Sequence, residues 1–288
     1  MNVRIYTDSA TDLPASVTQS LGITVMPLMV SIDGHEYEDG VTLTSKEMFD
    51  GMREGKDYKT AQVPIHIFQE VFQSAAEAGE EILYIAFSSG LSGTYSSAVM
   101  VLNMIKEDYP DIACDVIDTK CASVGFGLVV RQAALWAQEG LSRAELVDKV
   151  TKLAANMEHV FTVDDLEYLY RGGRVSKTSA VIGGLLNIKP VLDVEDGKLI
   201  PIEKVRGRKK SISRLAELFE ERGITEDKDQ LIGISHGDDP ETAESLKAIL
   251  IEKYGLKNFI INSIGCAIGA HAGPGTMSLF FLNKNYSE

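Results

Sequence analysis

The segment Ser88-Ser89-Gly90-Leu91-Ser92-Gly93-Thr94 is rich in hydroxyl side chains and glycines. Hydroxyl groups donate hydrogen bonds to carboxylate or phosphate oxygens, and glycine lets backbone N–H groups approach a ligand closely. An apolar run at 82–87 precedes the stretch, and a helical pattern at 94–107 follows it. The carboxyl end of a strand and the N-terminus of a helix are both places where α/β proteins bind anions. We therefore predict a pocket for the headgroup of a ligand. The alternative is that the glycines form a turn and Ser92 caps a helix, because both structures favour the same residue types.

One histidine, His271, lies in the glycine-rich segment 265–275. Its ring nitrogens could bind a ligand there, but a lone histidine is more often a core or turn residue. A serine hydrolase would pair Ser92 with His271. The nucleophile elbow G-x-S-x-G requires glycine at position 94, where the sequence has threonine, and no acidic residue is evident to orient the histidine.

Motifs for nucleotides and metals are missing from the sequence. It contains no G-x-x-x-x-G-K-[ST] phosphate loop, and Gly125 and Gly127 lack the third glycine of a dinucleotide fingerprint. His236, Asp238 and Asp239 have side chains that could bind a metal, but a turn and a helix cap explain the same residues. The three cysteines form no C-x-x-C pair. We expect no metal and no cofactor.

Two basic clusters lie in the second half of a strongly acidic chain. They consist of Arg171, Arg174 and Lys177, and of Lys204, Arg206, Arg208, Lys209 and Lys210. Such runs are usually solvated faces. Their concentration beside glycines also suggests a docking surface for an acidic or nucleotide-bearing partner.

The pattern of elements indicates an α/β fold with two domains. Strands expected at 3–7, 24–32, 82–87 and 113–117 alternate with helices, which is typical of a parallel sheet. On the 94–107 helix, Met100, Leu102, Met104 and Ile105 form an apolar stripe, more typical of a core than of a tunnel for an acyl chain. From residue 158 the pattern changes, because strands at 188–194 and 198–205 read as a hairpin. We predict a parallel-sheet domain at 1–157 and a mixed-sheet domain at 158–288, the latter with a helix at 176–186.

Composition restricts the partners and the location. The 288 residues include 42 acidic and 28 basic side chains, giving a formal net charge of -14, which argues against nucleic acid. No apolar run approaches the roughly 18 residues of a membrane span, and the N-terminal residues are too polar for a signal peptide. The odd, sparse cysteine count suits a reducing compartment. We expect a cytoplasmic protein.

Five segments together resemble the DegV family of bacterial proteins. They lie at 7–13, 60–62, 88–95, 168–174 (with Arg171-Gly172-Gly173-Arg174) and 269–275 (with His271-Ala272-Gly273-Pro274-Gly275), in the family's order. The resemblance implies a two-domain α/β protein that encloses a long-chain fatty acid between its domains. Similar proteins are the carrier subunit of bacterial fatty acid kinases and present the carboxyl group to an ATP-binding kinase subunit, which makes an acyl phosphate.

The resemblance also implies roles for particular residues. Thr60, Ser92 and His271 would contact the carboxylate, Ser89, Gly90, Gly93 and Thr94 would support the headgroup loop, and Arg171, Arg174 and Arg206 would dock the kinase. Because phosphoryl transfer needs groups that this chain does not show, we expect a carrier and not an enzyme. Its partners would be a long-chain fatty acid and the kinase, with at most transient membrane contact for lipid exchange. The alternatives are a serine hydrolase or a binder of small carbonyl or phosphate ligands that uses Ser92 and His271, and a pure interaction module.

Overall fold

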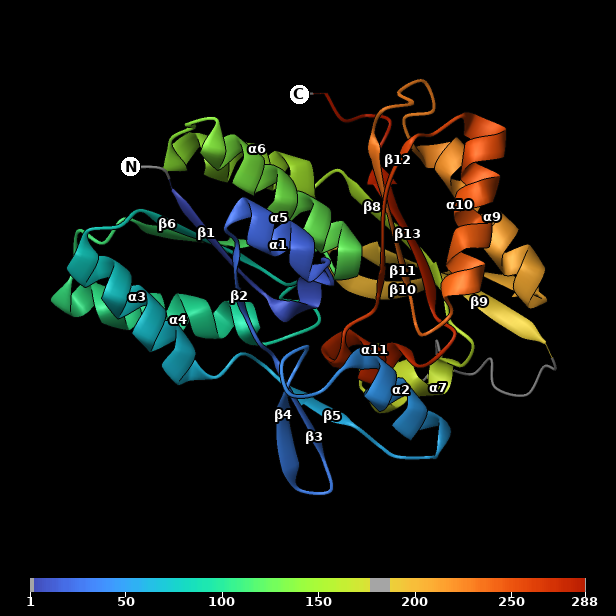
Figure 1. The fold of residues 1–288 in the computed structure, drawn as a ribbon, viewed down its shortest axis with the longest axis horizontal. Coiled ribbons are helices and arrows are strands. Elements are labelled where there is room, and N and C mark those ends of the chain that lie inside the picture. Colours follow the sequence, from blue (N-terminus) through green and yellow to red (C-terminus); the bar gives the residue numbers. More distant parts are fainter. Residues whose placement is uncertain (1–2, 177–186, 288) are drawn as a thin grey trace.

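The computed structural model describes residues 3–176 and 187–287. The helix expected at 176–186 and the basic residue Lys177 therefore fall outside the described residues, apart from Ser176. Two large sheets and one small sheet make up the β-structure of the described part (Figure 1). This mixed arrangement confirms the α/β fold class.

The first large sheet is parallel throughout, as predicted. Its strand order is β2 (Thr24–Met26), β1 (Arg4–Asp8), β6 (Ile82–Ala86) and β7 (Cys114–Asp118). All five residues of β6 are buried, which explains why this inner strand reads as an unbroken apolar run. Helices α3 (Ile65–Ala78) and α4 (Thr94–Asp108) lie together on one side, and α1 (Ala15–Leu21), α5 (Ser123–Gln138) and α6 (Arg143–Ala154) on the other (Figure 1).

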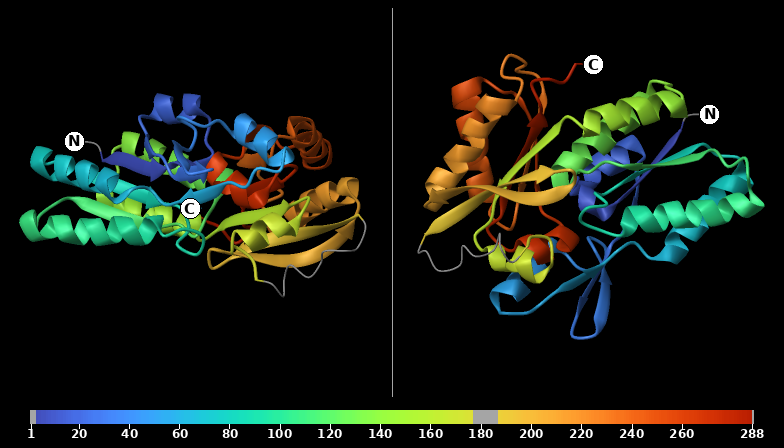
Figure 2. Two further views of the ribbon diagram at one scale, coloured as in Figure 1. Left: turned by 90° about the horizontal axis from the view of Figure 1, so that it is seen from below. Right: turned by 180° about the vertical axis from the view of Figure 1, so that it is seen from behind.

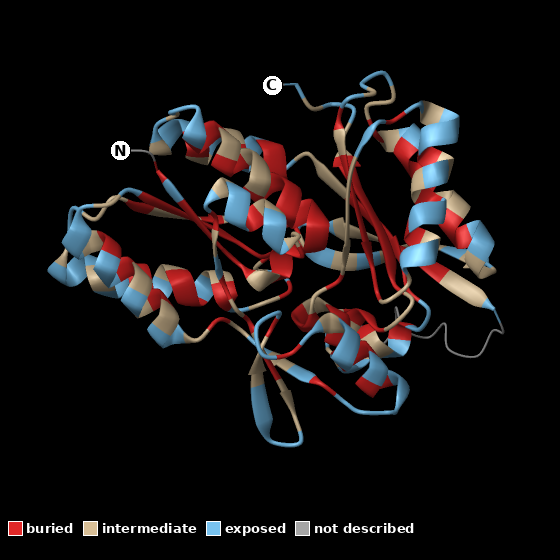
Figure 3. Cartoon of the chain, in the orientation of Figure 1, coloured by how far each residue is buried: buried red, intermediate tan, exposed pale blue. Residues whose placement is uncertain are grey.

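The second large sheet is mixed. Its order is β10 (Lys198–Arg206), β9 (Ile188–Glu195), β8 (Met157–Thr162), β13 (Met277–Leu282), β11 (Leu231–His236) and β12 (Asn258–Ser263). Only the β11–β12 pair is parallel among these pairings, and β9 with β10 forms the expected hairpin around Asp196-Gly197. Helices α9 (Arg208–Arg222) and α10 (Pro240–Tyr254) pack on this sheet, and α5 contacts both large sheets. The strands of both sheets and α5 contain much of the buried core (Figure 3).

The small sheet corrects one expectation. The strand predicted at 24–32 is divided at Pro27-Leu28, where proline has no N–H to donate, into β2 and β3 (Met29–Ile32). Strand β3 pairs antiparallel with β4 (His35–Glu38) and β5 (Lys59–Ala61), and this sheet projects from the edge of the molecule opposite α6 (Figure 2).

Residues from both halves of the chain share one core beside the small sheet. It includes Val30, Met48 and Phe49 from the first half and Cys266 and Ala270 from the second. Its helices are α2 (Ser45–Arg53) and α11 (Cys266–Ala272), with α7 (Leu166–Arg171) packed against α11. This shared core fixes β5, α7 and α11 relative to one another, and β5 and α11 carry Thr60 and His271 of the candidate site.

Candidate functional site

A hydrogen bond between Thr60 and His271 forms the centre of the candidate site. Thr60 Oγ1 on β5 lies 2.6 Å from His271 Nε2 on α11. The sequence did not indicate a helix in this glycine-rich segment, but small residues let α11 pack tightly. A Cβ atom at Gly269 would collide with Met48 and Phe49, and one at Gly172 would collide with His271 Nδ1.

Arg174 links the two halves of the chain at the same place. Its Nε and Nη2 donate to the carbonyl oxygen of Leu91 at 3.1 and 2.9 Å, and its Nη1 donates to that of Gly172 at 2.5 Å. The guanidinium therefore holds the Ser-Gly stretch of the first sheet against the loop that follows α7. Sequence reasoning placed Arg174 on a docking surface, and in the structure it also lines the cavity described below.

The predicted headgroup residues divide into two groups. Ser92 and Gly93 line the cavity, and Ser92 Oγ bonds Thr94 Oγ1 at 2.8 Å and accepts from Thr94 N at 3.3 Å, where α4 begins. Gly90 instead lies against the tip of the β9–β10 hairpin, where Ser88 Oγ also donates to Gly197 O at 2.8 Å. Ser89 Oγ accepts from Lys120 Nζ at 2.8 Å, and a Cβ atom at Gly90 would come 2.5 Å from Gly197 O. Thus Thr60, Ser92, Gly93 and His271 share one cavity, whereas Ser89 bonds Lys120 and Gly90 contacts the hairpin.

The cavity itself is mainly apolar and is walled by both halves of the chain. The space that no atom fills amounts to about 900 Å³, its open mouth included. Its apolar wall consists of Leu28, Phe87, Leu91, Ala122, Phe161, Leu169, Val194, Leu199, Ile264, Ala267, Ile268 and Phe280. Sequence reasoning missed this wall, since its members come from many elements and share no local pattern.

The interpretation of the α4 stripe as core, preferred to an acyl tunnel, is correct for Leu102 and Ile105 and wrong for Met100 and Met104. Met100 and Met104 are 45% and 48% exposed, so they face solvent and belong neither to the core nor to the cavity. Leu102 is buried in the core of the first sheet.

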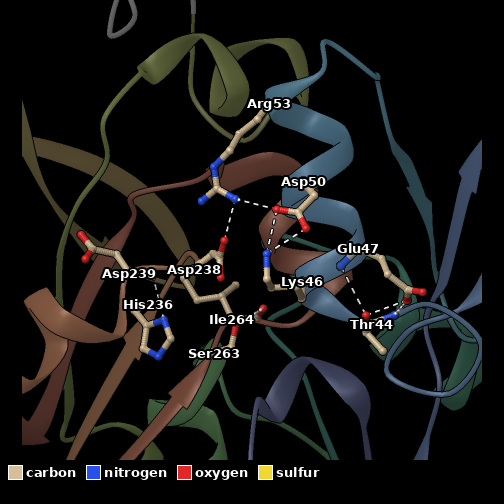
Figure 4. Close-up of polar contacts among 10 residues, drawn as sticks. All are labelled: Thr44, Lys46, Glu47, Asp50, Arg53, His236, Asp238, Asp239, Ser263 and Ile264. Carbon is tan, nitrogen blue, oxygen red and sulfur yellow. Dashed lines mark hydrogen bonds and ion pairs between the residues drawn. The ribbon is translucent and has the colours of Figure 1, made fainter.

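No group of acidic, histidine or cysteine side chains suited to a metal occurs in residues 3–176 and 187–287. His236 Nδ1 accepts a hydrogen bond from Asp239 N at 3.2 Å, and Asp238 pairs with Arg53 of α2 at 2.5 Å (Figure 4). These residues therefore form a turn and a contact between the two halves of the chain. Within the described segments, no helix is long and apolar enough to cross a bilayer.

The other proposed docking residues are exposed. The Arg171 guanidinium lies 5.0 Å from the Tyr168 ring centroid and 3.8 Å from an Asp57 oxygen. Arg206 ends β10, and Gly207 separates it from α9. In the same run Arg208 is bound to Asp239 at 2.9 Å, whereas Lys204, Lys209 and Lys210 are exposed.

Burial makes His271 a neutral side chain. It lowers the pKa of His271 from 6.5 to about 4, and the charge of Arg174 acts in the same direction. We expect the NMR signals of this ring in the ligand-free protein to titrate with a midpoint near pH 4, with His271→Gln used to assign them. A midpoint near 6.5 would contradict this environment. A carboxylate bound beside the ring should move the midpoint upward, because a neighbouring negative charge favours imidazolium.

The architecture defines an α/β protein whose two halves enclose a mainly apolar cavity. A family model described as "Uncharacterised protein, DegV family" matches residues 2–284. A DegV domain-containing protein of Clostridium perfringens is 43% identical over 281 residues, which cover 96% of each chain. A second one, from Caldanaerobacter subterraneus, is 38% identical over 282 residues, which cover 98% of this chain and 99% of the relative. The chain belongs to the DegV family.

Solved structures agree with this assignment. A DegV family protein from Thermus thermophilus, described by its fatty acid binding, superposes with a TM-score of 0.88 at 30% identity, covering 98% of this chain and 100% of its own. A stearic acid-binding protein from Eubacterium ventriosum gives a TM-score of 0.88 at 28% identity, covering 98% of each chain. The predicted two-domain DegV-like fold is therefore confirmed.

Proposed function

We propose that this protein binds one long-chain fatty acid, with its chain in the apolar cavity and its carboxylate at Thr60, Ser92 and His271. The observation that carries the proposal is the Thr60–His271 pair at the wall of a mainly apolar cavity. The fatty acids bound by the structural relatives support it.

The apolar wall supplies most of the affinity. Burying a chain of about sixteen carbons at about 0.8 kcal/mol per methylene gives on the order of 10 kcal/mol before the costs of binding. The polar residues have a different task, because a buried carboxylate without hydrogen bonds costs several kcal/mol. Hydroxyl and imidazole donors therefore select a carboxylate as the headgroup.

We further propose that the protein is a carrier that presents the carboxyl group to a separate ATP-dependent kinase for acyl phosphate formation. The sequence has no nucleotide-binding motif, and phosphoryl transfer depends on phosphate clamps and Mg²⁺. The exposed arginines Arg171 and Arg206 are suited to docking the kinase. Arg174 donates to two backbone carbonyls, so we assign it to holding the cavity wall.

The hydrolase alternative finds no support in the geometry. His271 Nε2 bonds Thr60, and the hydroxyl of Ser92 bonds that of Thr94. A histidine whose pKa is about 4 is also a poor general base near neutral pH, where the best catalytic pKa lies close to the working pH.

Native mass spectrometry of the purified protein tests the proposal, and we expect one retained long-chain fatty acid per chain. After delipidation, Ser92→Ala should bind palmitate more weakly, by about tenfold or more, because it loses one hydrogen bond to the charged carboxylate, which contributes about 1.5–3 kcal/mol. Ser96→Ala is the matched control, since Ser96 is exposed in the first turn of α4, just after the loop that carries Ser92. With ATP and Mg²⁺ the protein alone should form no acyl phosphate.

Two results would refute parts of this proposal. Wild-type protein that binds no fatty acid would rule out the ligand. Acyl phosphate formed by a preparation free of kinase would rule out the carrier and make the chain an enzyme.

A further inference from the structure

A buried serine on the cavity wall has a hydroxyl without a hydrogen-bond partner. Ser278 on β13 is 5% exposed and lines the cavity. Side chains alternate along a strand, so Ser278 and Phe280 face the cavity, whereas Met277, Leu279 and Phe281 belong to the core that α9 and α10 cover. Within the described part of the chain, the Ser278 side chain makes no hydrogen bond. Its hydroxyl therefore faces the space that a ligand would fill.

Other polar side chains on this wall already have partners. Ser123 Oγ bonds the Asp12 carboxyl group at 2.5 Å and Ser235 Oγ at 2.9 Å. The two ring nitrogens of His159 bond backbone groups at 2.8 and 3.1 Å. Thr276 Oγ1 donates to backbone carbonyls, with two of them at 2.9 Å. The unpartnered hydroxyl is thus a feature of one position on β13 and not of the wall in general.

The place of Ser278 along the wall indicates which part of a bound chain it meets. Thr276 Oγ1 bonds the carbonyl oxygen of Ala272, the residue that follows His271. From Thr276 the chain runs as β13 past Ser278 to Phe280. At about 3.4 Å per residue, Ser278 lies about 7 Å further along the wall than Thr276. It therefore faces the interior of an acyl chain whose carboxylate lies at His271.

An unsubstituted acyl chain would bury this hydroxyl against methylene groups. A buried donor that has no partner weakens binding by about tenfold to a hundredfold. A hydroxyl on the acyl chain has the same cost where it meets an apolar wall. Both costs disappear when the two hydroxyls meet, because a serine hydroxyl can donate and accept a hydrogen bond.

We infer that the cavity contains a subsite for a hydroxyl group in the interior of the acyl chain, with Ser278 as its ligand. The inference rests on the proposed fatty acid function and names the class of fatty acid, a long-chain acid that is hydroxylated away from its carboxyl group. The carboxylate site at Thr60, Ser92 and His271 serves hydroxylated and unsubstituted chains alike. Ser278 is the residue that distinguishes between them.

The test compares stearate with stearates hydroxylated at carbon 8, 10 or 12, by calorimetric titration of delipidated protein. We expect at least one hydroxystearate to bind the wild type as tightly as stearate does, or more tightly. Ser278→Ala should strengthen the binding of stearate and weaken that of the preferred hydroxystearate. The ratio of the two affinities should therefore shift toward stearate by about tenfold or more.

Two further variants separate the hydrogen bond from other effects. Ser278→Cys keeps a side chain of similar size but has only a weak S–H donor, so it should shift the ratio in the same direction as alanine does. Ser31→Ala is the matched control, because Ser31 lies on β3 outside the cavity. It should leave the ratio unchanged.

The outcomes separate this inference from the proposed function. Wild-type protein that binds stearate, but binds all three hydroxystearates more weakly, would overturn the subsite alone. The same holds if the ratio of affinities in Ser278→Ala stays within about twofold of the wild-type ratio. Wild-type protein that binds neither stearate nor any hydroxystearate would overturn the fatty acid function and the subsite together.

Discussion

Replacing Gly172 with alanine should lower the affinity for palmitate by about ten- to a hundredfold while leaving the fold intact. Gly172 has ordinary helical backbone angles, φ -72° and ψ -9°, so alanine introduces no backbone strain. Its Cβ atom would, however, collide with His271 Nδ1. The ring must then move, and its hydrogen bond to Thr60 is lost together with the one that we propose to a bound carboxylate. A hydrogen bond to a charged group contributes about 1.5–3 kcal/mol, which gives the expected range.

The ring cannot be relieved by a shift of its helix, because α11 is tightly packed. A Cβ at Gly269 would already collide with Met48 and Phe49, so little space lies behind the helix. Calorimetric titration of delipidated protein with palmitate measures the effect. The neighbouring Gly173 is the matched control, since it has φ +72° and nothing within 4 Å of an added Cβ.

Gly173→Ala should therefore reduce the free energy of unfolding by about 1 kcal/mol through backbone strain, with little change in palmitate affinity. If the two glycine variants bound palmitate equally well, the ring of His271 would not be a determinant of binding.

The parallel sheet could be predicted because its signals are local. The run at 82–87 is apolar at every position, since β6 is an inner strand with helices on both faces. The β9–β10 hairpin could likewise be predicted, from its Asp196-Gly197 turn. The extent of the strand expected at 24–32 was wrong. Apolar residues continue across Pro27, although the chain passes there from one sheet to another.

The candidate site was much less visible in the sequence. Thr60 and His271 are 211 residues apart, and nothing in the spacing of either residue indicates that they meet. Their pairing was suggested by the family resemblance and is formed by a core that joins α2 to α11. Arg174 reads as a surface cation in a basic loop, whereas its contacts with Leu91 O and Gly172 O depend on tertiary packing.

A buried carboxyl group lies in the turn that follows β1. Asp12 is buried and joins the two halves of the chain. Its Oδ2 accepts from Ser123 Oγ at 2.5 Å, and its Oδ1 accepts from Gly265 N at 2.8 Å, just before α11. Ser123 also bonds Ser235 of β11 at 2.9 Å. One carboxyl group therefore connects α5, β11 and the helix that carries His271.

Burial raises the pKa of Asp12 well above its usual value, although the bonds from Ser123 and Gly265 oppose this shift. A carboxyl group whose folded pKa is raised stabilises the fold below its unfolded pKa, and this contribution is lost as pH rises through the folded pKa. Relative to Asp12→Asn, which does not titrate, the wild type should therefore lose stability as the pH increases above about 4.

Asp12→Ala should reduce the free energy of unfolding by about 3 kcal/mol or more. The hydroxyl of Ser123 and the N–H of Gly265 would lose a buried acceptor, at about 1–3 kcal/mol each, and alanine at φ +48° adds about 1–2 kcal/mol of strain. Urea denaturation measures the loss. Asp33→Ala is the matched control, because Asp33 is exposed at a similar φ of +51° and carries the strain without the buried bonds.

Asp12→Asn should stay within about 1 kcal/mol of wild type, since asparagine tolerates this backbone and its amide bonds both partners. If Asp12→Ala cost no more than Asp33→Ala, the carboxyl group would not join the two halves of the chain.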